Sequence, residues 1–204
     1  MRRRRSNTAA IDLFANIGLG FIALFLLVLL QVNPVAKQKD IDARAEYLVT
    51  IEWQDGSADD VDLWLRMPDG DFVSWVKKGS GPTFLDRDDL GTDNNQYIVG
   101  NEVRVANIRR ETITVRTNVP GEYHVSVHLY LRRWTGPTPQ VRVTILKLNP
   151  HQVIAERVIG LEMTGQEETA ARFWVDEQGR VTKVVSDGEP WVVHALAKRR
   201  GGLQ

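Results

Sequence analysis

Residues 13–30 form an apolar run, LFANIGLGFIALFLLVLL, in which eighteen consecutive residues carry no charge. A helix rises about 1.5 Å per residue, so this run gives about 27 Å of helix, and a few flanking residues complete the ~30 Å of a hydrocarbon core. We therefore predict a transmembrane helix over residues 11–32. Every other part of the chain must lie on one side or the other of this span.

The charges on the two sides of the span differ. Four arginines occupy residues 2–5, within a basic tail over residues 1–10, whereas residues 37–46 contain three basic and three acidic side chains. Basic residues next to a span are retained in the cytoplasm. We expect a cytoplasmic N-terminus in the bacterial inner membrane, with a linker over residues 33–46 and the C-terminal domain in the periplasm.

A cleavable signal peptide is the main alternative to an anchor, because it also begins with basic residues. Its apolar region is usually shorter and ends in a small-x-small cleavage site. Residues 31–36 of this chain, QVNPVA, offer only a poor site of that kind. We therefore favour an uncleaved signal anchor.

The composition limits the classes of protein to which the chain can belong. The chain has 204 residues, no cysteine, and 26 basic against 26 acidic residues. Without cysteine it has neither disulfides nor thiolate metal sites, which is more typical of a Gram-negative periplasmic protein than of a small secreted module. The balanced charge argues against nucleic-acid binding. About 160 residues after the anchor are enough for one well-buried domain.

Polar and small residues follow one face of the predicted span. Asp12, Asn16, Gly20 and Ala23 are spaced by four, four and three residues. Intramembrane carboxylates are costly and often move ions, and small residues let a second helix approach closely. The alternative is that Asp12 is only the N-cap of the helix, at the headgroup boundary. Helical spacing alone leaves both interpretations open.

Asp12 and the apolar run resemble the single-span proteins of the ExbD/TolR and MotB group. The matching residues are Ile11-Asp12-Leu13-Phe14 and GFIALFLL over residues 20–27. The resemblance implies that Asp12 carries protons, that Asn16, Gly20 and Ala23 face a channel, and that the chain forms a stator-like homodimer with a multi-span TolQ/MotA/ExbB-like subunit. The chain departs from the family after the membrane, with no OmpA-like or ExbD-type domain. The competing hypothesis is a passive membrane-anchored binding or scaffold protein.

Beyond residue 47 the hydrophobic pattern has period two, and turn residues recur at short intervals. The clearest strand places Tyr123, Val125, Val127, Leu129 and Leu131 on one face and His124, Ser126, His128 and Tyr130 on the other. Turns are predicted at residues 68–70, 120–121, 149–150 and 177–179. We therefore predict an all-β fold, an antiparallel β-sandwich of eight to ten strands over residues 47–198.

Three short segments of this domain resemble bacterial envelope β-sandwiches of the pre-peptidase type. The matching stretches are DVDLWL over residues 60–65, Pro68-Asp69-Gly70, and GEYHV over residues 121–125. These relatives are mostly accessory or binding modules. The resemblance supports the fold more than a function.

Two polar segments of the domain are candidate metal sites. Asp86, Asp88, Asp89 and Asp93 could supply oxygen ligands to calcium, but Leu90 stands where an EF-hand loop needs an oxygen, so an ordinary polar loop is the alternative. His124 and His128 share a strand face about 13 Å apart, too far for one ion, and a solvent-facing pair is favoured.

No nucleophile, paired-carboxylate or phosphate-loop motif appears, so we expect neither an enzyme nor a cofactor.

Six tryptophans are spread over the predicted domain: Trp53, Trp64, Trp75, Trp134, Trp174 and Trp191. Exposed aromatic side chains dock glycans or proteins, but a second buried face of the sandwich is the favoured explanation. Residues 191–200 are expected to form a short amphipathic helix with a basic end. The pattern gives no role for this helix.

Overall fold

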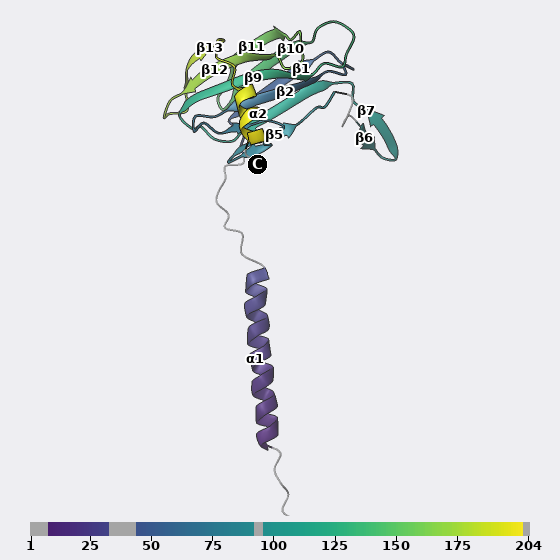
Figure 1. The fold of residues 1–204 in the computed structure, drawn as a ribbon. Coiled ribbons are helices and arrows are strands. Elements are labelled where there is room, and N and C mark those ends of the chain that lie inside the picture. Colours follow the sequence, from purple (N-terminus) through teal and green to yellow (C-terminus); the bar gives the residue numbers. More distant parts are fainter. Residues whose placement is uncertain (1–7, 33–43, 92–95, 202–204) are drawn as a thin grey trace, which may run out of the picture. The chain divides into compact units, whose positions relative to one another are not determined.

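The computed structural model describes residues 8–32, 44–91 and 96–201 and divides the chain into two compact units, residues 1–42 and 43–204. The first unit contains one helix, α1 (Thr8–Val32), which Figure 1 draws in purple. Residues 8–29 of α1 have a mean hydropathy of 2.3 and none of their side chains is buried. By length and composition, α1 is able to cross a membrane.

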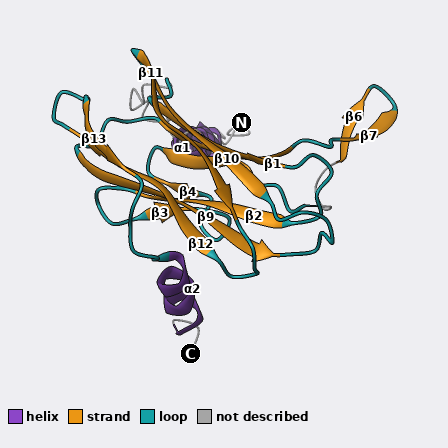
Figure 2. Cartoon of the chain, turned by 90° about the horizontal axis from the view of Figure 1, so that it is seen from above, coloured by secondary structure: helices purple, strands orange, loops and turns teal. Residues whose placement is uncertain are grey.

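The second unit is an antiparallel β-sandwich, which confirms the predicted fold class. Sheet A has six strands in the order β11-β10-β1-β8-β5-β4, and sheet B has five in the order β13-β12-β9-β2-β3 (Figure 2). Sheet A contains β1 (Tyr47–Trp53), β4 (Gly79–Ser80), β5 (Thr83–Arg87), β8 (Arg109–Val115), β10 (Gln140–Leu148) and β11 (His151–Gly160). Sheet B contains β2 (Asp60–Arg66), β3 (Phe72–Val73), β9 (Gly121–Leu131), β12 (Glu167–Val175) and β13 (Val181–Val185).

Within the described residues the two sheets hold eleven strands, more than the eight to ten predicted. One of them, β4, is two residues long and therefore too short to produce an alternating pattern. A separate hairpin, β6 (Gln96–Val99) with β7 (Glu102–Val105), projects from the sandwich and exposes every residue (Figure 1).

The core lies between the inner faces of the two sheets. On β1 the burial alternates strictly, so that Tyr47, Val49, Ile51 and Trp53 face sheet B. Tyr123 and Phe173, from β9 and β12, stack with ring centroids 5.0 Å apart and both contact Tyr47. Period-two alternation thus becomes two apolar faces closed against each other.

Two of the predicted turns reverse the chain as expected. Between β2 and β3, Gly70 has φ +82° and its amide donates to the Met67 carbonyl at 2.9 Å. Between β12 and β13, Gly179 has φ +70° and its amide donates to the Asp176 carbonyl at 2.9 Å. Both positions need the left-handed conformation that glycine adopts at little cost.

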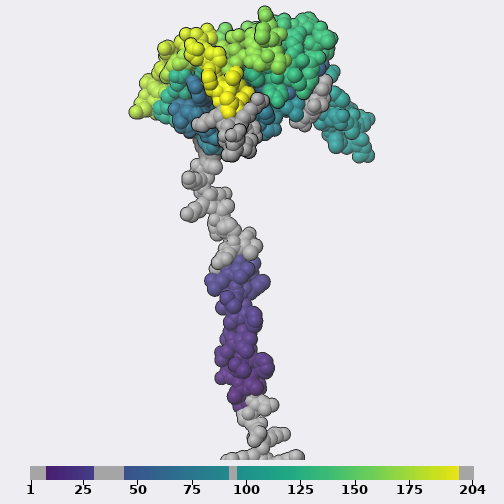
Figure 3. Space-filling model, in the orientation of Figure 1, coloured from purple at the N-terminus to yellow at the C-terminus, as the bar shows by residue number. Residues whose placement is uncertain are grey.

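The outer face of sheet B carries a third layer. Helix α2 (Val192–Gly201) lies against it, with Trp191 and Val192 packed on Trp64 in a small apolar cluster apart from the main core. The space-filling view shows α2, in yellow, lying across the surface of the sandwich (Figure 3). The predicted amphipathic helix is therefore present, and it closes one side of the sandwich.

Candidate functional site

Asp12 lies inside α1. The helix begins at Thr8, three residues before the predicted start of the span, so Asp12 is its fifth residue. An N-cap residue precedes the first helical residue, and helix ends are uncertain by only one or two positions. These bounds do not support the N-cap interpretation of Asp12. The basic tail up to residue 7 and the linker over residues 33–43 lie outside the described residues.

Helical geometry places the four polar and small residues predicted for one face of the span near one another. At about 100° per residue, Asn16 lies roughly 40° from Asp12 around the axis, Ala23 roughly 20° and Gly20 roughly 80°. All four residues are exposed, as are the large apolar side chains of the same helix up to Leu29. Within this single chain α1 therefore presents one polar and small-residue face, surrounded by apolar side chains.

In the sandwich, the polar outer face of sheet B is organised in rows across three strands. One row consists of Arg66, His124 and Arg172, which are register partners on β2, β9 and β12. Another row, on the same three strands, consists of Asp62, His128 and Glu167. Residues from distant parts of the sequence are brought together because antiparallel pairing places them directly opposite.

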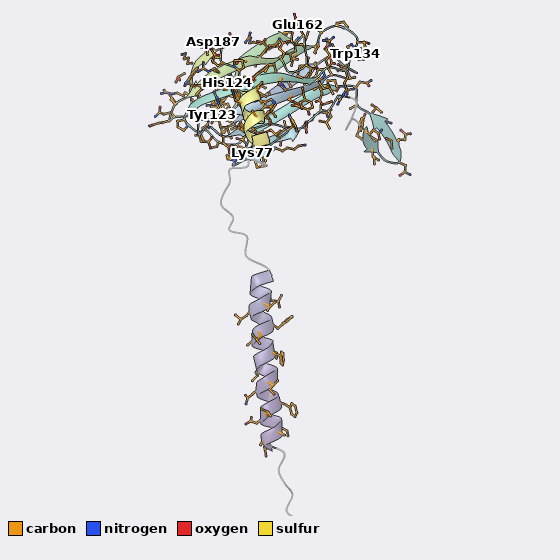
Figure 4. All side chains as sticks on the ribbon, in the orientation of Figure 1. Lys77, Tyr123, His124, Trp134, Glu162 and Asp187 are labelled. Atoms are coloured by element: carbon orange, nitrogen blue, oxygen red, sulfur yellow. The ribbon has the colours of Figure 1, made fainter. Side chains whose placement is uncertain are left out.

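His124 and His128 are buried, 2% and 4% exposed, so the expected solvent-facing pair is wrong. For His124 (labelled in Figure 4) the cause is the C-terminal segment: a side-chain carbon on Gly188 would lie 3.0 Å from its ring, and the Trp191 ring lies 5.9 Å away. Each histidine has partners of its own. His128 Nδ1 lies 3.2 Å from Asp62 Oδ2. Among the described residues, no group of three or more acidic or histidine side chains is arranged to hold a metal ion.

The hydrogen bonds of His124 define its tautomer. Arg66 Nη2 lies 3.1 Å from His124 Nδ1, and an arginine can only donate, so Nδ1 accepts. The proton therefore sits on Nε2, which donates to Thr169 Oγ1 at 2.9 Å. Burial, together with the charges of Arg66 and Arg172, lowers the pKa of His124 to about 4. His124 is neutral at physiological pH.

A cavity of about 690 Å³ opens where this row meets α2. Its walls include Arg66, Phe72, His124, Arg172, Trp191 and His194. The guanidinium of Arg66 lies 5.2 Å from the centre of the Trp191 ring, and the Trp191 indole N–H donates to Ser126 Oγ at 3.0 Å. The cavity thus combines cationic and aromatic walls.

A second polar group, of buried carboxylates, lies near the start of β2. Burial, followed by the nearby Asp62 charge, raises the pKa of Asp60 to about 7. Burial also raises the pKa of Asp62 and holds that of Glu111 well above its ordinary value. The Glu111 carboxylate accepts the Leu63 amide at 2.6 Å and the Asp89 amide at 3.3 Å. Glu111 therefore joins β8 of sheet A to β2 of sheet B.

Three of the four aspartates of the predicted calcium loop lie within the described residues, and one of them, Asp89, contributes to this group. Asp86 accepts the Thr114 hydroxyl, Asp88 pairs with Lys78 at 2.7 Å, and Asp89 pairs with Arg87 at 3.0 Å. Each of these carboxylates thus has a protein partner. Asp93 lies outside the described residues.

The six tryptophans divide by burial as their positions in the fold require. Trp53, Trp64 and Trp191 are at most 7% exposed, Trp75 and Trp174 are half-buried, and Trp134 is 38% exposed. Trp64 stacks on Phe72 at 5.5 Å and meets the Trp191 ring edge-on at 5.7 Å. The tryptophan on the second face of the sandwich is therefore buried, as favoured, because α2 covers it.

Sequence reasoning did not identify the Arg66–His124–Arg172 row or Glu111. The alternating pattern did place Arg66 and His124 on the outward faces of their strands. It did not give the register between the strands, which brings these two residues and Arg172 side by side. Glu111 had a weaker signal: it follows two arginines at the start of an alternating strand, where a charged residue normally faces solvent.

No known family model matches the chain, and no curated protein is similar to it in sequence. Two solved structures are similar in fold. One is a protein of unknown function, 18% identical, with a TM-score of 0.45 over 72% of this chain and 94% of that chain. The other is a homologue of the telluride resistance protein TerD from Streptomyces coelicolor A3(2), 13% identical, with a TM-score of 0.42 over 74% of this chain and 96% of that chain. Both likenesses are too low to carry a function to this chain.

Proposed function

We propose that this protein is the single-span subunit of a proton-driven channel complex of the TolQ/MotA type in the bacterial inner membrane. The observation that carries the proposal is Asp12, an ionisable residue inside a helix whose other described residues are uncharged. A carboxylate within a span is expensive in lipid, faces protein or water, and marks an ion or proton path by default.

The surroundings of Asp12 on the helix support a channel partner. Asn16 offers an amide to the same face, and Gly20 and Ala23 leave room there for the backbone of another helix. The remaining surface of α1 is made of exposed Leu, Ile, Phe and Val side chains, which suit lipid or apolar walls. We expect two copies of α1 inside a multi-span TolQ/MotA/ExbB-like subunit, with the N-terminus cytoplasmic.

In this proposal Asp12 binds a proton entering from one side of the membrane and releases it toward the other. The change of charge on the Asp12 carboxylate alters its attraction to polar groups of the channel and so drives movement between subunits. The β-sandwich is the periplasmic head that anchors the complex or transmits its force.

The decisive experiment first asks whether a neighbouring gene encodes a multi-span TolQ/MotA-like subunit, and then replaces Asp12 by asparagine in the chain co-expressed with that subunit. Asp12→Asn keeps the shape of the side chain but no longer ionises, so proton flux through the complex should be lost while membrane insertion and abundance are unchanged. Asp12→Glu should retain partial flux, because it keeps a titratable group. Asp55→Asn is the matched control, because it removes the same charge from an exposed turn of the head, outside the span.

A passive membrane-anchored binding or scaffold protein is the second candidate. The cavity on the outer face of sheet B favours it, because that site is formed entirely by the head. Under this alternative Asp12→Asn is silent and no channel subunit co-purifies with the chain. Full function of the Asp12→Asn variant, or absence of a multi-span partner, would therefore exclude the channel proposal.

A further inference from the structure

We infer that the cavity between α2 and sheet B binds a small molecule that joins an oxyanion, a carboxylate or a phosphate monoester, to an aromatic or apolar group. The inference concerns the head alone and does not depend on the role of Asp12.

The charge of Arg66 is the first argument. Among the residues that the structure describes, no carboxylate lies within 4 Å of its guanidinium. Glu122, on the same face, is close enough for a Coulomb attraction to Arg66, but its carboxylate accepts the Arg172 Nε–H at 2.5 Å. The polar partner of Arg66 is His124, which is neutral and accepts one N–H of the guanidinium. Arg66 is half-buried and makes no ion pair of its own among the described residues, so its charge favours an anion from outside the chain.

The position of Arg66 is the second argument. The contact with the Trp191 ring and the bond to His124 hold the guanidinium in place before any ligand arrives. Only one of its five N–H donors is used by that bond, so donors remain for a planar or tetrahedral oxyanion. A guanidinium that is already held in place loses less conformational entropy on binding than a free side chain does.

The size and lining of the cavity argue for a ligand larger than a bare ion. A volume of about 690 Å³ lies within the range of small-molecule sites. Its apolar lining comes from Phe72, Pro190, Trp191 and Ala195. Phe72 is the register partner of Arg66 on β3, so apolar and cationic walls adjoin. Flat groups that stack on aromatic walls would fill this part while the oxyanion reaches Arg66.

One acidic residue also lines the cavity. Glu189 is exposed and makes no ion pair with Arg66. Its charge opposes an anionic ligand, although exposure to solvent screens the effect. Replacing Glu189 by glutamine should therefore strengthen binding modestly, which is the opposite of what a cation site would show.

The test is calorimetric titration of the full chain in a non-ionic detergent. The probes are benzoate, phenyl phosphate, inorganic phosphate and benzamide, which is the neutral counterpart of benzoate. We expect benzoate or phenyl phosphate to bind at millimolar concentration or tighter, and to exceed benzamide and inorganic phosphate. The preferred aromatic probe identifies the natural oxyanion as carboxylate or phosphate. Equal binding of benzoate and benzamide, or no binding of either aromatic anion, would overturn the inference.

Variants locate the site. Arg66→Gln should weaken binding about ten- to one-hundredfold, as expected for loss of a charge-assisted bond. Arg66→Lys keeps the charge but not the fork, and should bind between the wild type and Arg66→Gln. Arg142→Gln is the matched control, because Arg142 is exposed on sheet A and paired with Glu156 at 2.7 Å. Unchanged affinity in both Arg66 variants would show that the anion binds elsewhere and refute the assignment.

Discussion

Asp60→Asn should make the stability of the sandwich less dependent on pH. The pKa of Asp60 is about 7 in the folded chain and 3.8 for the free side chain, so the folded state holds its proton more tightly than the unfolded state. An acid with a raised folded pKa stabilises the fold fully below its unfolded pKa, and that contribution is lost as the pH rises through the folded value. The relevant window is therefore pH 4 to 8.

The magnitude follows from the same pKa difference. A change from 3.8 to about 7 corresponds to a ceiling of about 4 kcal/mol at full burial. Solvent at the edge of the cluster, and Arg133 with its Nη1 3.9 Å from Asp60 Oδ2, screen the charge. We therefore expect about half of the ceiling, ~2 kcal/mol. Relative to the wild type, Asp60→Asn should gain this amount between pH 4 and pH 8, or about 4–8 °C in Tm.

The assay is thermal unfolding of the full chain in detergent at intervals across that window, followed by near-ultraviolet circular dichroism. Asp55→Asn is the matched control, because Asp55 is exposed in the turn after β1. A stability difference between Asp60→Asn and the wild type that stays constant with pH would refute the reasoning. So would a calcium-dependent rise of the wild-type Tm that grows with pH, because it would show that these carboxylates ionise and share a cation.

Three further predictions address the covered face and the topology. His124 has the opposite linkage: its folded pKa of about 4 lies below the free value of 6.5, so its contribution is present above pH 6.5 and is lost as the pH falls toward 4. His124→Gln should reduce this acid loss by about 1–2 kcal/mol in the same unfolding series, a value discounted because the half-buried Arg66 and Arg172 charges are screened by solvent. An unchanged loss of stability between pH 6.5 and pH 4 would contradict it. Trp191→Ala should lower the free energy of unfolding by about 3 kcal/mol, because it removes a buried ring that packs on Trp64 and donates a hydrogen bond to Ser126. Denaturant unfolding measures this loss. A loss below about 0.5 kcal/mol would mean that α2 does not close this face. A cysteine introduced at the exposed Glu177 should react with a membrane-impermeant maleimide in cells whose outer membrane alone is permeabilised; labelling only after rupture of the inner membrane would reverse the proposed orientation.

Much of the fold was readable from the order of residues. An uncharged run of eighteen residues has no place in an aqueous surface, so the presence of α1 followed from composition and length alone. The alternation over residues 123–131 predicted β9 and its apolar face, since successive side chains of a strand point to opposite sides. Gly70 and Gly179 marked turns because their backbone conformation excludes most other residues.

What the sequence did not determine is the fate of the polar face of sheet B. His124, Asp62 and His128 alternate with buried residues, as solvent-facing residues do, yet all three are buried. Gly188 and Trp191, from the end of the chain, lie against His124, whereas Asp62 and His128 lie against each other. Likewise, Glu111 bonds Leu63 across 48 positions of sequence. A local pattern records which side a residue faces, whereas the layer that covers that side depends on contacts between distant segments. The cavity beside Arg66 exists for that reason, and only the tertiary structure decided it.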